Sequence, residues 1–104
     1  MTLITPSSLI DTIAIQAYCD TQPIQQLALF GSLLHGDSTE TWDIDLLVEY
    51  DEHTPVSYLG TAQHEMDLSD IIGRRVDLRT RAELSRYFRA RVIAEAMVIY
   101  ERDR

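Results

Sequence analysis

Two aspartates separated by one residue are the first feature of this sequence that could carry chemistry. Asp43 and Asp45 flank Ile44 at the start of an apolar stretch that ends at Tyr50. If this stretch is a strand, residues two apart face the same side, so both carboxylates project together. They repel each other unless a cation lies between them, and their hard oxygen atoms suit Mg²⁺ or Mn²⁺. We therefore predict a divalent-metal site at Asp43 and Asp45.

A third carboxylate, Asp77, lies between Val76 and Leu78 in a short alternating stretch, residues 75–79. It has two interpretations. It can be the solvent-facing member of an edge strand. Alternatively, if its strand pairs beside residues 44–50, it joins the two aspartates there. Three carboxylates on adjacent strands could hold two divalent ions for phosphoryl or nucleotidyl transfer.

Gly31 and Ser32 directly follow an apolar run, residues 27–30. Glycine permits close approach of the backbone to a ligand. Ser32 supplies a hydroxyl and, with the amides of a helix start, a place for phosphate oxygens. A glycine after a strand and a pair of aspartates are each weak signals, but their combination is more specific.

Hydrophobic periodicity and turn residues predict the elements that must position these side chains. The pattern predicts an α/β (α+β) domain, in which helices pack against a small mixed β-sheet, and a single domain over residues 1–104. We expect helices over residues 6–19 and 58–72, the second ended by Gly73, and a helical stretch from the Thr80 cap to about Ala96 with a break near Ser85. We expect strands over residues 24–30, 44–50, 75–79 and 98–100, and a short helix that opens within residues 32–35.

Charge is divided unevenly along the chain of 104 residues. Residues 1–73 contain twelve Asp or Glu and no Lys or Arg, whereas residues 74–104 contain all nine Arg and five Asp or Glu. The sum, −12 plus +4, is the net charge of −8. An acidic body argues against direct binding of nucleic acid and suits a partner with a basic surface, although acidity also simply favours solubility. No apolar run is long enough for a membrane span, and the first residues predict no signal peptide, so we expect a cytoplasmic protein.

Several other residues that could carry chemistry have a structural interpretation. We expect the single cysteine, Cys19, in the core, and we expect His53 and His64 at the surface. Tyr87 and Phe88 are expected either in the core or at an interface.

One motif resembles a known family. Leu29–Phe30–Gly31–Ser32, ten further residues and then Asp43–Ile44–Asp45–Leu46–Leu47–Val48 resemble the signature of DNA polymerase beta-like nucleotidyltransferases. The small size is similar to that of the minimal nucleotidyltransferase (MNT) group, and the similarity extends through residues 75–78 and 93–101. The resemblance implies the polymerase beta-like fold. It also implies that Gly31 and Ser32 hold the triphosphate of ATP, and that Asp43, Asp45 and Asp77 form the catalytic, Mg²⁺-binding set.

The same resemblance implies a partner and a reaction. MNT proteins are commonly the antitoxins of HEPN-domain toxins, and they move AMP from ATP to a tyrosine of the toxin ribonuclease. This sequence departs from the pattern at Leu33 and His35, where many relatives have arginine. Two alternatives therefore stand beside the protein adenylyltransferase: a catalytically weakened antitoxin that neutralises by binding alone, and a nucleotidyltransferase that acts on a small molecule.

Overall fold

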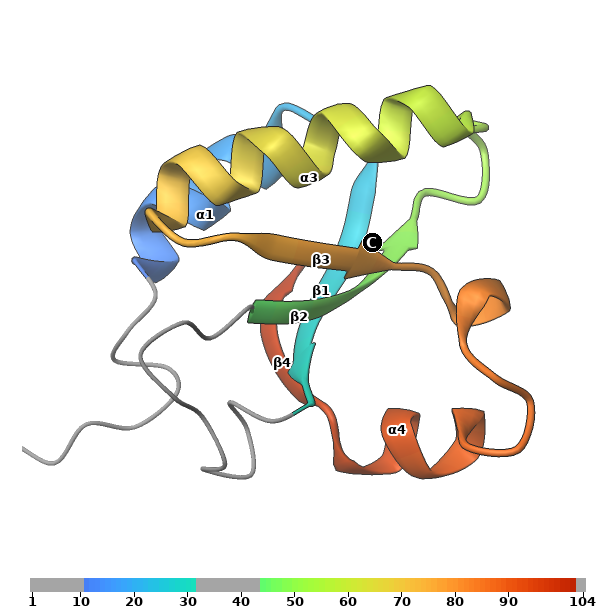
Figure 1. Ribbon diagram of the computed structural model, residues 1–104. Helices are drawn as coiled ribbons and strands as arrows, with labels where there is room; N and C mark the ends of the chain where they lie inside the picture. Colours follow the sequence, from blue (N-terminus) through green and yellow to red (C-terminus); the bar gives the residue numbers. More distant parts are fainter. Residues whose placement is uncertain (1–10, 32–43, 103–104) are drawn as a thin grey trace, which may run out of the picture.

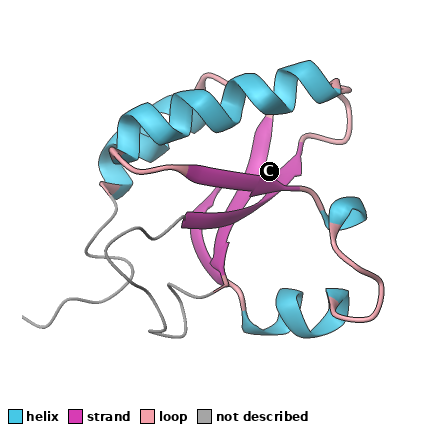
Figure 2. Cartoon of the chain, viewed as in Figure 1, coloured by secondary structure: helices cyan, strands magenta, loops and turns pink. Residues whose placement is uncertain are grey.

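The computed structural model describes residues 11–31 and 44–102. Four strands form one mixed sheet in the order β3–β2–β1–β4, and the helices α1 and α3 lie together along one side of it (Figures 1 and 2). The predicted mixed sheet with packed helices is confirmed. The elements are α1 (Thr12–Asp20), β1 (Ile24–Phe30), β2 (Ile44–Tyr50), α3 (Tyr58–Ile72), β3 (Val76–Arg79), the 3₁₀ turn η2 (Arg81–Glu83), α4 (Arg89–Glu95) and β4 (Met97–Glu101).

The first described helix, α1, begins after an N-cap at Asp11. Asp11 has an extended backbone, and its side chain accepts a hydrogen bond from the N–H of Ala14 at 3.1 Å. This is the geometry of an N-cap, which satisfies an amide that has no partner within the helix. A continuous helix over residues 6–19 is therefore wrong at residue 11, and the part of that prediction over residues 6–10 lies outside the described residues. The short helix expected within residues 32–35 lies outside the described residues.

The helical stretch that we predicted from Thr80 to about Ala96 is interrupted near Ser85, as expected. Residues 81–83 form η2, and α4 starts only at Arg89. At the start of η2, the carboxylate of Glu83 accepts a hydrogen bond from the backbone N–H of the N-cap residue, Thr80, at 3.0 Å, as in a capping box. The break near Ser85 is confirmed, and the single helical stretch becomes a turn and a short helix.

The core lies between the sheet and the helices α1 and α3. One face of each strand supplies buried side chains, of which β4 contributes only Tyr100, and α1 supplies Ile15 and Cys19. Burial raises the pKa of the Cys19 thiol to about 12, so this cysteine is a protonated core residue, as expected. No helix within the described ranges is long and apolar enough to cross a membrane.

His64 was expected at the surface, and that expectation was wrong. Its side chain is buried on α3, with Nδ1 2.9 Å from the hydroxyl of Tyr50 and Nε2 3.2 Å from Oε1 of Gln22. Tyr18 packs edge-on against the same ring. Desolvation lowers the pKa of His64 from 6.5, and the nearby carboxylate of Asp67 opposes that shift only in part.

The buried histidine makes stability depend on pH. Below pH 6.5 the unfolded chain binds a proton that the folded chain excludes, so His64 destabilises the fold as the pH falls and has no such effect above 6.5. We expect the free energy of unfolding, from urea titration, to be lower at pH 5.5 than at pH 7.5, by at most about 1.4 kcal/mol per pH unit. His64→Gln should flatten this difference. His53→Gln, at an exposed position, should leave it intact, and an equal effect of the two substitutions would contradict the assignment.

Candidate active site

The acidic residues of two neighbouring strands lie side by side. β2 and β3 are parallel, and Asp45 and Asp77 are direct partners in their register. Residues that pair in this way project to the same face of the sheet from strands about 4.8 Å apart. The interpretation in which Asp77 joins the residues of the second strand is therefore the one that the structure supports.

The residues on either side of the pair explain why the carboxylates point away from the helices. Ile44 and Leu46 on β2, and Val76 and Leu78 on β3, are buried in the core. Because side chains alternate along a strand, burial of these four places both aspartates on the opposite face. Burying each of these apolar side chains contributes about 1.5–3 kcal/mol, which makes the orientation of the carboxylates costly to reverse.

Gly31, directly after β1, lies against the carboxylate of Asp45. Phe30 pairs with Asp45 in the antiparallel register, and Gly31 follows with φ of +84°. A Cβ atom at Gly31 would collide with Oδ2 of Asp45 and lie 3.0 Å from its Cγ. Glycine is therefore required here twice, by its backbone conformation and by the space that the carboxylate occupies.

The described residues contain part of the predicted metal site. Asp43 and Ser32 lie outside them, so their predicted roles stay predictions. Within residues 11–31 and 44–102, no group of three His, Cys, Asp or Glu side chains could hold a metal ion. Asp45 and Asp77 nevertheless offer the hard oxygen donors that Mg²⁺ or Mn²⁺ prefers. The donor set fits such an ion.

Arginines flank the acidic pair on its own face. Arg79 is two residues beyond Asp77 on β3, and Arg75 is two residues before it. The carbonyl of Arg75 accepts the N–H of Ile44 at 2.8 Å, so the strand pairing continues to this residue. Nη1 of Arg79 lies 3.9 Å from Glu83 across an exposed gap, which is a weak ion pair. The side chains of both arginines are exposed, so an anionic ligand can reach them.

Side chains of α3 hold the outer edge of β3 in place. Oγ of Ser69 accepts the N–H of Val76 at 3.0 Å, and Oε2 of Glu65 accepts the N–H of Leu78 at 2.8 Å. These bonds bracket Asp77 on both sides. A small hollow of about 150 Å³ lies beside them, lined by residues of α3, β3 and η2 that include Tyr58, Glu65, Asp77 and Arg79.

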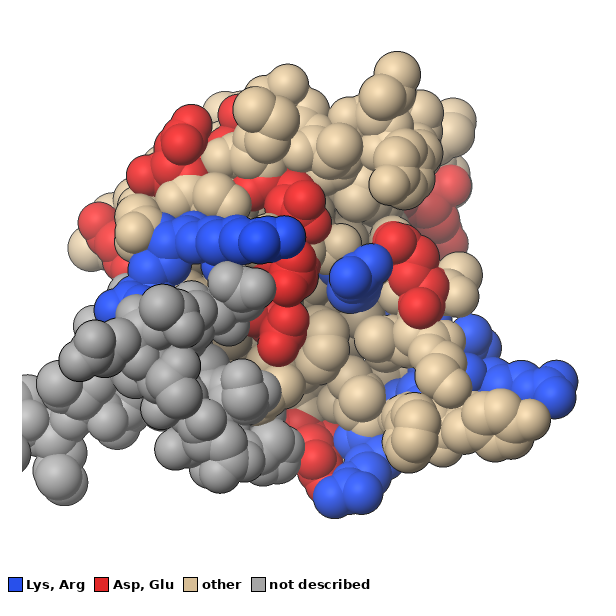
Figure 3. Space-filling view, in the orientation of Figure 1, with Lys and Arg blue, Asp and Glu red and all other residues tan. Residues whose placement is uncertain are grey.

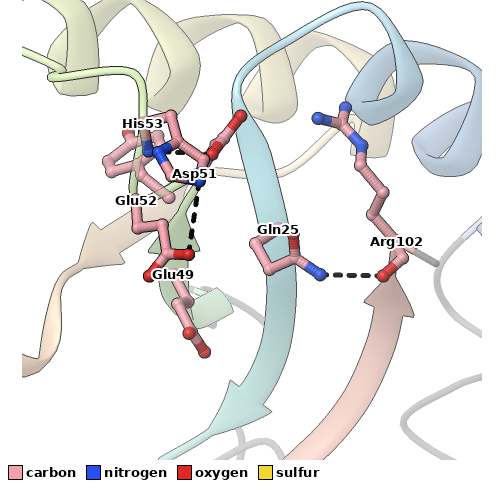
Figure 4. A pocket seen from close by; sticks show the side chains of 7 residues that line it. Gln25, Glu49, Asp51, Glu52, His53 and Arg102 are labelled. Atoms are coloured by element: carbon pink, nitrogen blue, oxygen red, sulfur yellow. Dashed lines mark hydrogen bonds and ion pairs between the residues drawn. The ribbon is translucent and has the colours of Figure 1, made fainter. Parts of the chain in front are cut away.

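A larger hollow, of about 320 Å³, lies at the other end of β2 and is not part of this site. Its lining includes Glu49, Asp51, Glu52 and His53 (Figure 4). There the side-chain amide of Gln25 donates to the carbonyl of Arg102 at 2.7 Å. Because Asp45 lies near the start of β2 and this hollow lies at the end of that strand, the two are separate.

Comparison with known proteins shows the family to which this chain belongs. The nucleotidyltransferase domain model matches residues 13–100, and the chain belongs to that family. The transferases of this family move a nucleotidyl group. One curated relative, "Putative protein adenylyltransferase MJ1379" of Methanocaldococcus jannaschii, is 33% identical over 76% of this chain and 79% of its own length.

Solved structures share the fold. One described as "Structure of putative minimal nucleotidyltransferase" has a TM-score of 0.68 and 29% identity, covering 83% of this chain and 86% of the other. A second is a tri-AMPylated HEPN toxin of Shewanella oneidensis in complex with its MNT antitoxin, with a TM-score of 0.62 and 16% identity, covering 94% of this chain and 74% of the other. At that identity the second likeness shows the fold alone. The predicted minimal nucleotidyltransferase fold is confirmed.

Proposed function

We propose that this chain is a protein adenylyltransferase that moves AMP from ATP to a tyrosine hydroxyl of a HEPN-domain toxin, and so acts as its antitoxin. The observation that carries the proposal is the direct pairing of Asp45 with Asp77 beside the closely packed Gly31. The family match, the adenylyltransferase relative and the antitoxin complex of the same fold support the choice of reaction and partner.

The site residues have separate roles in the proposed reaction: metal binding, phosphate binding and orientation of the acceptor hydroxyl. Asp43, Asp45 and Asp77 would hold Mg²⁺ or Mn²⁺, and Gly31 with Ser32 would place backbone amides and a hydroxyl against the triphosphate. A bound divalent ion supplies neutralisation of the phosphate charge. Asp77 orients the acceptor hydroxyl and accepts its hydrogen bond as the oxygen approaches the α-phosphorus.

The transfer itself is an in-line displacement. A bond forms between the hydroxyl oxygen and the α-phosphorus, and the bond from that phosphorus to the oxygen bridging the β-phosphate breaks. Pyrophosphate leaves with the electron pair of that bond, and the hydroxyl proton passes to a carboxylate or to water. The contribution of the protein is positioning and electrostatic stabilisation, because the rigid strands fix the carboxylates before the substrates arrive.

Transfer of label tests the proposed function. The chain is incubated with ATP labelled on the α-phosphate, Mg²⁺ and the protein encoded by the neighbouring gene. We expect label on that protein and, by mass spectrometry, an AMP adduct on tyrosine. The absence of label on the partner, with label appearing on an aminoglycoside or another small hydroxyl compound, would favour the small-molecule alternative.

Arg75 is the residue that we expect to replace the arginines missing at Leu33 and His35. Its carbonyl accepts the N–H of Ile44 at the start of β2, so it lies at the end of the site where Gly31 would meet the phosphates. Charge-assisted hydrogen bonds to phosphate are among the strongest that proteins make. Arg75→Ala should therefore weaken ATP binding about tenfold, measured by isothermal titration calorimetry with Mg²⁺ and no partner.

Arg91→Ala is the matched control for this measurement. Arg91 lies on α4 and pairs with Glu95 of the same helix at 3.2 Å. Its loss should leave ATP binding unchanged. Equal affinities of the Arg75→Ala and wild-type chains for ATP would show that other groups neutralise the phosphates.

A further inference from the structure

The connection from β3 to β4 crosses the sheet from one edge to the other. We name residues 80–96 the crossover arm; it contains η2 and α4. Because β3 and β4 are the two outermost strands, the arm must pass both β2 and β1, and α1 and α3 already occupy one side. Figure 1 shows α4 away from those helices, on the far side of the sheet. The ion pair between Arg81 and Glu49, at 3.8 Å, ties the start of the arm to the face that carries the acidic pair.

Two aromatic side chains stand out from the crossover arm. Tyr87 is 79% exposed and Phe88 is 60% exposed, which excludes the core and leaves the interface of the two locations expected for them. The guanidinium of Arg86 lies 5.2 Å from the centre of the Tyr87 ring and donates to its hydroxyl at 3.3 Å. Helix α4 packs only loosely against the other described elements. Exposed aromatic residues beside arginine are the composition of interface hot spots.

Hydrogen bonds within the crossover arm hold the turn before α4. The carbonyl of Ser85 accepts the N–H groups of Phe88 and Arg89 at 3.0 and 2.9 Å. Nη2 of Arg89 donates to the carbonyl of Leu84 at 3.1 Å. These bonds fix the turn from which Tyr87 and Phe88 project. Anchors that are already ordered lose little freedom when a partner binds.

The charge of the arm is opposite to that of the rest of the chain. It contains four Arg and two Glu, a net +2 in a chain of −8. Figure 3 shows Arg and uncharged side chains over α4 with an acidic group beside them, below the larger group of acidic side chains in the middle of the same face. Such a surface complements an acidic patch that surrounds an apolar pocket.

The arm also ends beside the site. Met97, directly after it, pairs with Leu29 on β1, and the next residue of β1, Phe30, pairs with Asp45. A macromolecule held by the arm would therefore lie next to the carboxylates. A polyanion is a poorer occupant, because the acidic body of the chain repels it.

We propose that the crossover arm is the docking surface for the protein that carries the acceptor hydroxyl, and that this partner presents acidic side chains around an apolar pocket for Tyr87 and Phe88. The proposal rests on the proposed function for the identity of the partner. It adds which surface of this chain binds the partner and which chemistry binds it.

The test compares binding with catalysis in the full-length chain. The double variant Tyr87→Ala/Phe88→Ala should raise the Kd for the neighbouring-gene product at least about 30-fold, by surface plasmon resonance, while ATP binding stays at the wild-type value. Arg86→Glu should slow association, and added salt should lessen the difference from wild type. Ile13→Ala and Met66→Ala are matched controls at exposed apolar positions on α1 and α3, and both should bind the partner normally.

Several results would overturn the docking proposal. One is wild-type partner affinity in the double variant. Another is binding of mixed-sequence RNA by the wild-type chain that disappears in Arg86→Glu, since it would assign the arm to nucleic acid. The proposed function fails separately: a partner that binds through the arm but takes up no AMP contradicts the chemistry and leaves the docking surface in place. AMP transfer with unchanged binding in the double variant contradicts the docking surface alone.

Discussion

Asp45→Asn and Asp77→Asn should each reduce AMP transfer to the partner by at least about 100-fold, a loss like that of a single group that stabilises charge in a transition state. Each substitution keeps the size of the side chain and removes its negative charge. The two side chains lie on one face of paired strands, so neither can take over the position of the other. Initial rates of label transfer measure the effect.

Asp70→Asn is the control for this pair, because Asp70 is an exposed acid on α3, away from the strands of the site. It should transfer AMP at the wild-type rate. Circular dichroism should show that all three variants are folded. If the two site variants transfer AMP as fast as Asp70→Asn, the acidic pair is not catalytic.

The same variants separate an enzyme from an antitoxin that acts by binding alone. In cells that express the toxin, Asp45→Asn should fail to protect growth if transfer of AMP is what silences the partner. Protection by Asp45→Asn, together with loss of protection in Tyr87→Ala/Phe88→Ala, would favour the binding-only alternative that the missing loop arginines suggested.

Gly31→Ala should lower the rate of AMP transfer on the order of 100-fold, because the new Cβ would collide with Asp45 and displace its carboxylate. The positive φ at this position should also destabilise the fold by about 1–2 kcal/mol. Transfer assays measure the first effect, and urea unfolding measures the second.

Gly73→Ala isolates the contact from the backbone effect. Gly73 has φ of +77° at the end of α3, and a Cβ there would meet nothing within 4 Å. This variant should lose similar stability and keep its activity. A Gly31→Ala chain as active as Gly73→Ala would show that the close packing on Asp45 is not needed for catalysis.

The strands were predictable because their signal is local. Continuous apolar runs define β1 and β2, and the helix from Tyr58 to Ile72 has its cap residues, Ser57 and Gly73, at its two ends. Local patterns also placed Asp45 on a strand. They could not place Asp77 beside it, because that neighbour relation depends on which strands pair, and pairing is a property of the whole sheet.

The error at His64 has the same physical origin. His64 is buried because Tyr50 and Gln22, 14 and 42 residues away, supply its hydrogen-bond partners. A polar residue without such partners would be excluded from the core, so the burial of His64 cannot be predicted from the residues next to it in the sequence. For Tyr87 and Phe88 the sequence left the core and an interface open, and their exposure in the described structure decides against the core.

The bonds from Ser69 and Glu65 to β3 also limit how this protein can assemble. An exposed edge strand offers free N–H groups that another chain can extend by adding a strand of its own. On β3 the outward N–H groups of Val76 and Leu78 are already used by α3. The strand that carries Asp77 therefore has neither N–H group left for β-augmentation, and we expect a partner beside Asp77 to bind through side chains and not by extending the sheet at β3.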